Sequence, residues 1–176
     1  MHRLLLVVVA ALATAASALD LPTRKAGLWE LTMTFEGRSL PPQAMKQCVD
    51  AASDKLMNLD FAGSNDLACS KQDMTRNGGT TVIDSVCKFG ETTTTSHAVV
   101  TGSFDSAYAV RVSSTRQGGP PLPGIAPGAE THMTIAAKWL GPCAAGQKPG
   151  DVIMANGMTM NVFDIQKMRK PAAAPK

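Results

Sequence analysis

The chain has 176 residues and a formal net charge of +3, from 17 Lys and Arg against 14 Asp and Glu. This near balance lacks the concentrated basic surface of a nucleic-acid-binding domain, so we expect no nucleic-acid partner. After the N-terminal segment, no apolar run is long enough to form a transmembrane helix.

The N-terminus has the pattern of a cleaved secretory signal. Arg3 precedes an apolar run from Leu4 to Ala13, and Ala16-Ser17-Ala18 supplies the small residues that a signal peptidase reads. A retained membrane anchor would need about 20 apolar residues, which this run does not reach. We therefore predict cleavage after Ala18, no transmembrane anchor in the mature chain, and a periplasmic or otherwise extracellular location.

The rest of the chain predicts one domain and a tail. We expect a signal peptide over 1–18, a single β-rich domain over 19–168 and a flexible, low-complexity tail over 169–176. The domain contains all four cysteines, and an even number in an oxidising compartment indicates two disulfides. The cysteines are too far apart in sequence for Cys-x-x-Cys metal sites, so we predict no metal and no other cofactor.

A half-buried strand opens the domain, and a helix is expected after it. The stretch GLWELTMTFEG alternates, with Trp29, Leu31, Met33 and Phe35 on one face. A Pro-led segment of helix-tolerant residues then predicts a short helix over 43–52, which would carry Cys48. The following stretch, MNLDFAGSND, is expected to be a loop.

The central cysteines flank a glycine-rich turn. Asn77-Gly78-Gly79 predicts a hairpin with strands over 67–75 and 80–89, since Asn and Gly tolerate the positive φ of a tight turn. A three-residue loop places Cys69 directly opposite Cys87, within disulfide range, whereas a two-residue loop would shift the register by one. We therefore predict Cys69–Cys87, which leaves Cys48–Cys143 as the second pair.

Three further strands complete the predicted sheet. They cover 91–102, 107–116 and 131–141, and Val100 is expected to pair with Val110. The Pro-rich stretch between the last two predicts an exposed loop. After Cys143 we expect a turn, a short strand and one turn of helix. The fold class is therefore mainly β: an antiparallel meander that forms a curved sheet or partial barrel, with one short N-terminal helix and two disulfides.

Landmarks along the chain resemble those of a known family. They are Gly27–Glu30 (Gly-Leu-Trp-Glu), Cys48 after a Pro-led segment, two central cysteines, Trp139–Cys143 (Trp-Leu-Gly-Pro-Cys) and Lys148–Asp151 (Lys-Pro-Gly-Asp). In this order, over about residues 24–166, they resemble a widespread family of small exported proteins of Gram-negative bacteria, a domain of unknown function. The resemblance implies a periplasmic location and paired cysteines, and it carries no activity.

Sequence motifs for catalysis are weak. There is no Gly-x-Ser-x-Gly elbow, and both His97 and His132 fall on the polar faces of their strands. Met154, Met158 and Met160 form a thioether cluster of the kind that binds copper(I), although methionine also fills irregular cores. We predict a protein that is not an enzyme, with copper(I) binding or catalysis as a distant third alternative.

Two functional classes remain. In the first, the protein is a binding module whose concave apolar face holds a small hydrophobic ligand. In the second, that face is a filled core and the protein contacts another envelope protein through its loops or an uncovered strand edge. A cavity under the apolar face would favour the first class. The candidate ligand-binding residues are Trp29, Leu31, Met33, Phe35, Tyr108, Val110, Met133 and Trp139.

Overall fold

The computed structural model describes residues 21–61 and 68–168. The predicted signal peptide over 1–18 and the predicted tail over 169–176 lie outside these residues. The loop predicted over 57–66 is wrong for residues 57–61, because helix α1 (Ala51–Phe61) continues through them, and the rest of that loop lies outside the described residues. In the part of the chain that is described, no helix has the length and apolar character needed to cross a bilayer.

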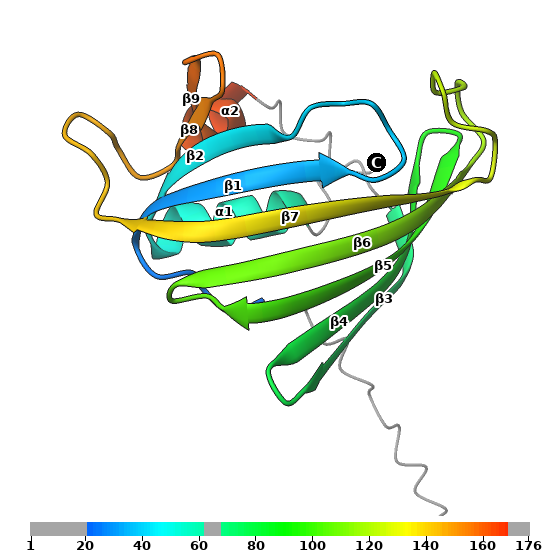
Figure 1. Ribbon diagram of the computed structural model, residues 1–176, viewed down its shortest axis with the longest axis horizontal. Helices are drawn as coiled ribbons and strands as arrows, with labels where there is room; N and C mark the ends of the chain where they lie inside the picture. The colour runs from blue at the N-terminus through cyan, green and yellow to red at the C-terminus, as the bar shows by residue number, and fades with distance from the viewer. Residues whose placement is uncertain (1–20, 62–67, 169–176) are drawn as a thin grey trace, which may run out of the picture.

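The described residues form one nine-stranded antiparallel sheet and two helices (Figure 1). The elements in chain order are β1 (Gly27–Phe35), β2 (Gln43–Val49), α1 (Ala51–Phe61), β3 (Ala68–Asn77), β4 (Thr80–Phe89), β5 (Thr92–Ser103), β6 (Ala107–Gln117), β7 (Glu130–Gly141), β8 (Asp151–Met154), β9 (Thr159–Asn161) and α2 (Val162–Met168).

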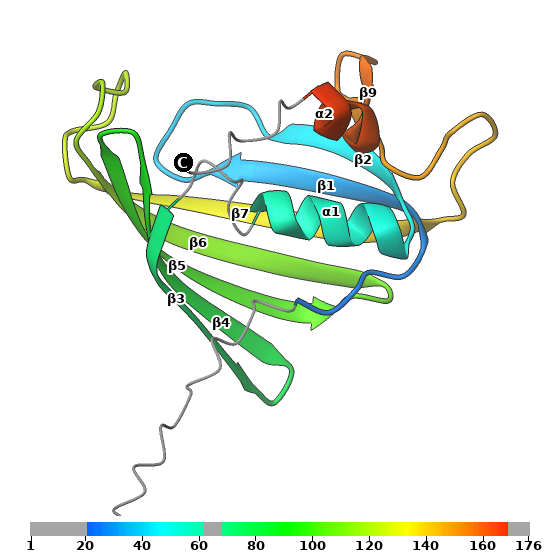
Figure 2. The same ribbon diagram turned by 180° about the vertical axis from the view of Figure 1, so that it is seen from behind.

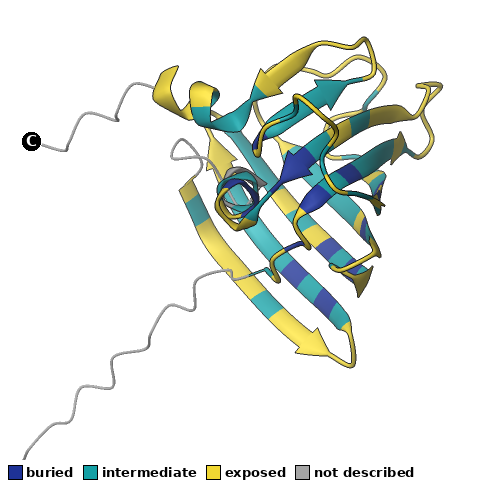
Figure 3. Cartoon of the chain, turned by 90° about the vertical axis from the view of Figure 1, so that its left-hand side faces the viewer, coloured by how far each residue is buried: buried dark blue, intermediate teal, exposed yellow. Residues whose placement is uncertain are grey.

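The strand order is β3-β4-β5-β6-β7-β1-β2-β8-β9. Strands β3 to β7 form a meander in which each strand pairs with the next along the chain, and β1 then lies between β7 and β2. The sheet curves around α1, which lies on its concave side (Figure 2), and Figure 3 looks along this helix inside the curve. The predicted antiparallel β fold is confirmed, and the sheet is open, with β3 and β9 at its edges.

The helix predicted over 43–52 is wrong, because β2 occupies most of that segment and α1 begins only at Ala51. The helix-tolerant residues of β2 pair with β1 along their whole length, and this tertiary pairing overrides their local propensity. Asp50 lies between β2 and α1 and caps the N-terminus of the helix, since its Oδ1 accepts a hydrogen bond of 2.8 Å from the Ser53 backbone N–H. That hydrogen bond and the one to the Ser53 hydroxyl lower the pKa of Asp50.

The predicted Cys69–Cys87 disulfide is confirmed, but the predicted three-residue loop is wrong. Asn77 pairs with Thr80, so the turn contains only Gly78 and Gly79, at φ of 53° and 82°. Two-residue hairpin turns need such positive φ values, which glycine adopts without strain. The register slips by one between Cys69 and Lys71, and this β-bulge returns Cys69 to the position opposite Cys87.

The second predicted disulfide, Cys48–Cys143, is also confirmed. It joins β2 to the segment that follows β7, with a sequence separation of 95 residues and a Cα–Cα distance of 5.4 Å. The segment after Cys143 was predicted to form a turn, one short strand and one turn of helix. The structure has two short strands there, β8 and β9, followed by the helix α2.

The core lies on the concave face of the sheet. The predicted pairing of Val100 with Val110 is confirmed, and both are buried beside Ile135 in one cluster. A second cluster surrounds Trp29, which is fully buried against Val49. Buried side chains therefore follow the inward positions of successive strands, while their neighbours in sequence face outward (Figure 3).

Candidate ligand-binding site

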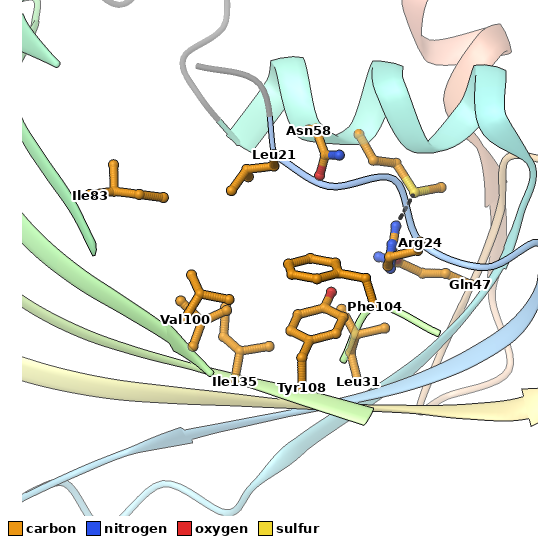
Figure 4. A pocket seen from close by; sticks show the side chains of 12 residues that line it. Leu21, Arg24, Leu31, Gln47, Asn58, Ile83, Val100, Phe104, Tyr108 and Ile135 are labelled. Carbon is orange, nitrogen blue, oxygen red and sulfur yellow. Dashed lines mark hydrogen bonds between the residues drawn. The ribbon is translucent and has the colours of Figure 1, made fainter. Parts of the chain in front are cut away.

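A cavity of about 120 Å³ lies between α1, the segment before β1 and the concave face of the sheet (Figure 4). In the close-up, Val100, Ile135 and Tyr108 rise from the sheet, and Leu21 and Asn58 lie on the opposite side. The lining residues are Leu21, Arg24, Leu31, Gln47, Met57, Asn58, Ile83, Val100, Phe104, Tyr108, Val110 and Ile135.

Strand alternation supplies the apolar floor of this cavity. Val110 pairs with Val100 on one side and with Ile135 on the other, so three neighbouring strands present aliphatic side chains at the same level. Phe104, in the turn between β5 and β6, stacks on Tyr108 with ring centroids 4.6 Å apart. The floor therefore combines aliphatic and aromatic surface, which is typical of sites for apolar ligands.

A buried ion pair forms the polar end of the cavity. The Arg24 backbone N–H and Nε donate to the Asp54 carboxylate at 2.9 and 2.5 Å. The Asp54 side chain is fully buried, and that of Arg24 is 5% exposed. Nη1 of Arg24 donates to Gln47 Oε1 at 2.8 Å, and Nη2 contacts the Met57 sulfur at 3.3 Å. Arg24 thus connects the segment before β1 to both α1 and the sheet, while its charge is neutralised by Asp54.

Tyr108 adds a hydroxyl to the same end of the cavity. Burial raises its pKa, and the nearby Asp54 carboxylate raises it further, while Arg24 opposes part of the effect. The neutral phenol is therefore the stable form in the folded protein, and it can donate a hydrogen bond to a ligand.

Tyr108 is the single tyrosine of the chain, so its titration can be followed directly. We expect the phenolate absorbance to appear at a higher pH than the ordinary tyrosine pKa of about 10. Because the folded state holds this proton more tightly than the unfolded state, the stabilisation is present below pH 10 and is lost as the pH rises through the folded pKa. An ultraviolet pH titration checks this, with Tyr108→Phe as the blank. Titration at or below pH 10 would contradict the assigned burial.

The structure brings only some of the predicted ligand-binding residues to this cavity. Leu31, Tyr108 and Val110 line it, whereas Trp29 is fully buried behind it and contacts Tyr108 with ring centroids 5.6 Å apart. The remaining predicted residues lie elsewhere. Met33 and Met133 pack against the core cluster further along the face, and Phe35 lines a cavity near the Pro-rich loop. The Trp139 ring lies under the Lys25 ammonium, and its Nε1–H donates to the Ala26 carbonyl.

Sequence reasoning missed the residues that come from outside the strands. Leu21, Arg24, Met57, Asn58 and Phe104 lie before β1, in α1 or in a turn, where no periodicity marks them. The missed strand residues, in contrast, had a visible signal. Ile83, Val100 and Ile135 occupy inward positions of alternating strands and could have been included.

The two histidines lie apart from the cavity. His97 Nδ1 is 2.8 Å from Asp84 Oδ1, and the two side chains are 51% and 44% exposed. His132 Nε2 is 3.9 Å from Glu130, again at an exposed position. Both pairs occupy the polar strand faces that alternation predicts, and neither lines the cavity beside Tyr108.

The three methionines near the C-terminus lie on one face of the β8–β9 hairpin. The Met154 backbone N–H donates to the Met158 carbonyl, and Met160 pairs with Val152. Because alternate residues of paired strands share a face, the three methionines lie on the same face of the hairpin. Met158 and Met160 are 53% and 38% exposed. Among the described residues, no group of three or more His, Cys, Asp or Glu side chains could hold a metal ion. Copper(I) binding by the methionines stays a prediction.

Comparison with known proteins gives a family but no activity. No curated protein and no solved structure matches the chain. Residues 24–143 match a family described as "Protein of unknown function (DUF3617)". The matched span runs from the buried Arg24 to Cys143, and so includes β1 to β7, α1 and both disulfides. The resemblance to a family of unknown function is confirmed over residues 24–143, short of the expected end near residue 166, and the chain belongs to this family.

Proposed function

We propose that this protein is an exported, non-catalytic binding module that holds a small apolar molecule between α1 and the concave face of the sheet. The observation that carries the proposal is the cavity of about 120 Å³ beneath α1. Two disulfides support a location in an oxidising compartment such as the periplasm. The absence of a catalytic motif in the sequence favours binding over catalysis.

The size and lining of the cavity define its ligand. An apolar cavity of about 150 Å³ in another protein binds benzene, so the present volume holds a ring or a short alkyl segment of similar size. Most of the lining is aliphatic or aromatic, while Tyr108 and Asn58 supply hydrogen-bonding groups. A mainly apolar molecule with one polar group fits this combination.

The rival function, contact with an envelope protein through the loops or an uncovered strand edge, receives less support at the edge formed by β3. β3 is an edge strand, and its side chains are mostly exposed and polar. Lys71 and Asp73 form an ion pair of 3.4 Å along it. Charged side chains and bulges on an edge strand oppose pairing with another chain, which favours ligand binding within the curve of the sheet.

A series of uncharged primary alkanols tests the proposal. We expect affinity to rise by about fourfold per added CH₂, equivalent to about 0.8 kcal/mol, until the apolar space is filled. Isothermal titration calorimetry measures this directly, and the change in heat capacity on binding should be negative. Alkanols that do not bind at any length would overturn the proposal.

A matched pair of variants on β5 locates the site. Val100 is 4% exposed and lines the cavity, whereas Val99 is its neighbour on the opposite face. Val100→Phe fills the space and should weaken alkanol binding by at least tenfold, while Val99→Phe adds the same bulk outside and should leave binding unchanged. Equal effects of the two variants would show that the alkanols bind elsewhere. Thermal unfolding of both variants controls for misfolding.

A further inference from the structure

The concave face continues beyond the cavity and changes in polarity along the strands. On β6 the inward residues are Val110, Val112, Ser114 and Arg116, in order of distance from the cavity. Alternate residues of a strand share a face, so these four form one row about 20 Å long. The row runs from aliphatic side chains through a hydroxyl to a guanidinium.

The neighbouring strands repeat this change. On β7, Ile135 pairs with Val110, Met133 with Val112 and Thr131 with Ser114. On β5, the partners of the β6 row are, in the same order, Val100, Ala98, Ser96 and Thr94. Three adjacent strands therefore become polar at the same level, which makes the face apolar at the α1 end and hydroxyl-rich at the other.

The Pro-rich loop between β6 and β7 covers the polar end. A cavity of about 430 Å³ lies between this loop and the sheet, with Leu122 and Ile125 of the loop in its lining beside Ser114, Thr131 and Arg116. An adjoining cavity of about 600 Å³ shares several of these residues and extends to apolar residues further along the face. Those residues are Phe35, Val112 and Met133.

The apolar residues connect this end to the cavity under α1. Val112 and Met133 line the adjoining cavity and also pack against the core cluster that contains Val110 and Ile135. Val110 and Ile135 in turn line the cavity under α1. A continuous apolar surface therefore runs from the first cavity to the region under the Pro-rich loop.

Arg116 is a cation with only neutral acceptors around it. Its Nη1 donates to the Pro120 carbonyl at 2.8 Å and its Nη2 to Thr92 Oγ1 at 3.2 Å. No carboxylate of the described residues forms an ion pair with it. Guanidinium has five N–H donors, so this partly buried side chain keeps donors for an anion. The Ser114 and Thr131 hydroxyls, 3.1 Å apart, lie in the same lining.

Among the described residues that line these two cavities, the carboxylates belong to the adjoining one. Glu36 and Glu130 line the adjoining cavity and not the one that contains Arg116. Glu130 lies near His132, and Arg38 stands over the Phe35 ring at 5.8 Å. The space beside Arg116 is therefore the part of this region best suited to a negative group.

We infer that the ligand is a single-chain amphiphile with a carboxylate head, of the fatty acid class. The carboxylate binds Arg116 under the Pro-rich loop, and the alkyl tail follows the concave face toward the cavity under α1. The length fits, because the row of about 20 Å accommodates a chain that spans one bilayer leaflet, about 15 Å. This inference rests on the proposed function and names the ligand class for that site.

Dodecanoate and dodecanol, which share one tail, test the head-group assignment at neutral pH. We expect the wild-type protein to bind dodecanoate about tenfold more tightly than dodecanol. Arg116→Gln should remove this preference by weakening dodecanoate binding about tenfold and leaving dodecanol binding unchanged. Arg111→Gln is the matched control, since Arg111 is an exposed residue of the opposite face of β6 and its loss changes the net charge equally.

The outcomes separate this inference from the proposed function. Equal binding of the two compounds, or an Arg116→Gln variant that still prefers dodecanoate, would overturn the carboxylate site and leave the apolar site intact. If Arg116→Gln weakened both compounds equally, Arg116 would act by holding the Pro-rich loop, and the inference would again fail. If neither compound bound the wild-type protein, the proposed function would fail with it. Thermal unfolding of each variant shows that the fold is preserved.

Discussion

Asp54→Ala should lower the free energy of unfolding by about 3–5 kcal/mol, because it leaves a buried cation without its partner. Asp54 is fully buried and accepts two hydrogen bonds from Arg24. With the carboxylate gone, Arg24 would keep only neutral side-chain partners, among them Gln47 and the Met57 sulfur. The loss is expected to appear as a lower midpoint in urea-induced unfolding, followed by circular dichroism.

Two further variants show whether the unpaired charge of Arg24 causes the loss of stability in Asp54→Ala. The double variant Arg24→Met with Asp54→Leu removes both charges and should recover much of the lost stability, since an apolar pair avoids the desolvation cost. Asp164→Ala breaks an exposed pair with Lys167 and should cause no measurable change. A loss below about 1 kcal/mol for Asp54→Ala would contradict the burial of the pair, because that size is typical of surface pairs.

Replacement of both Cys48 and Cys143 by serine should cost about 4–5 kcal/mol, and replacement of Cys69 and Cys87 about 3 kcal/mol. The difference follows from the closed loops, because the first disulfide spans 95 residues and the second spans 18. A longer loop restricts the unfolded chain more strongly, so its loss raises the entropy of the unfolded state more.

Urea-induced unfolding of the two double variants under identical conditions checks the order. The variants are matched in composition, since each replaces two cysteines with two serines. Equal losses, or a larger loss for the Cys69 and Cys87 variant, would contradict the loop-length explanation. Each variant should be analysed alongside the reduced wild-type protein, which lacks both disulfides.

The strands could be predicted because a sheet with one buried face imposes alternation on its residues. Trp29, Leu31 and Met33 on β1 show this pattern, as do Tyr108, Val110 and Val112 on β6. The disulfide of the β3–β4 hairpin could be predicted for a related reason, since antiparallel pairing brings residues on either side of a turn together. The compensating bulge could not be predicted, because nothing in the sequence around Ser70 distinguishes it from a regular strand.

Local propensity was misleading where pairing partners decide the structure. The residues of β2 tolerate a helix, and they form a strand because β1 and β8 lie on either side of them. The helix α1, with modest amphipathic character, gave little signal of its own. The ion pair joins Asp54 of α1 to Arg24, which lies 30 positions earlier in the segment before β1, so no sequence spacing could reveal it. The part of the site contributed by strands was therefore accessible from sequence, and the part contributed by α1 and the segment before β1 was not.

The position of the two disulfides also affects how the protein withstands proteases. Cys48–Cys143 closes a covalent ring that contains the whole meander and the exposed Pro-rich loop between β6 and β7. Cys69–Cys87 closes a second ring around the exposed Gly78-Gly79 turn. Exposed loops and turns are the usual places where a protease first cuts a folded chain. A single cut at either place would open a ring without separating the fragments, so the nicked protein would remain one covalent molecule with its strands still paired.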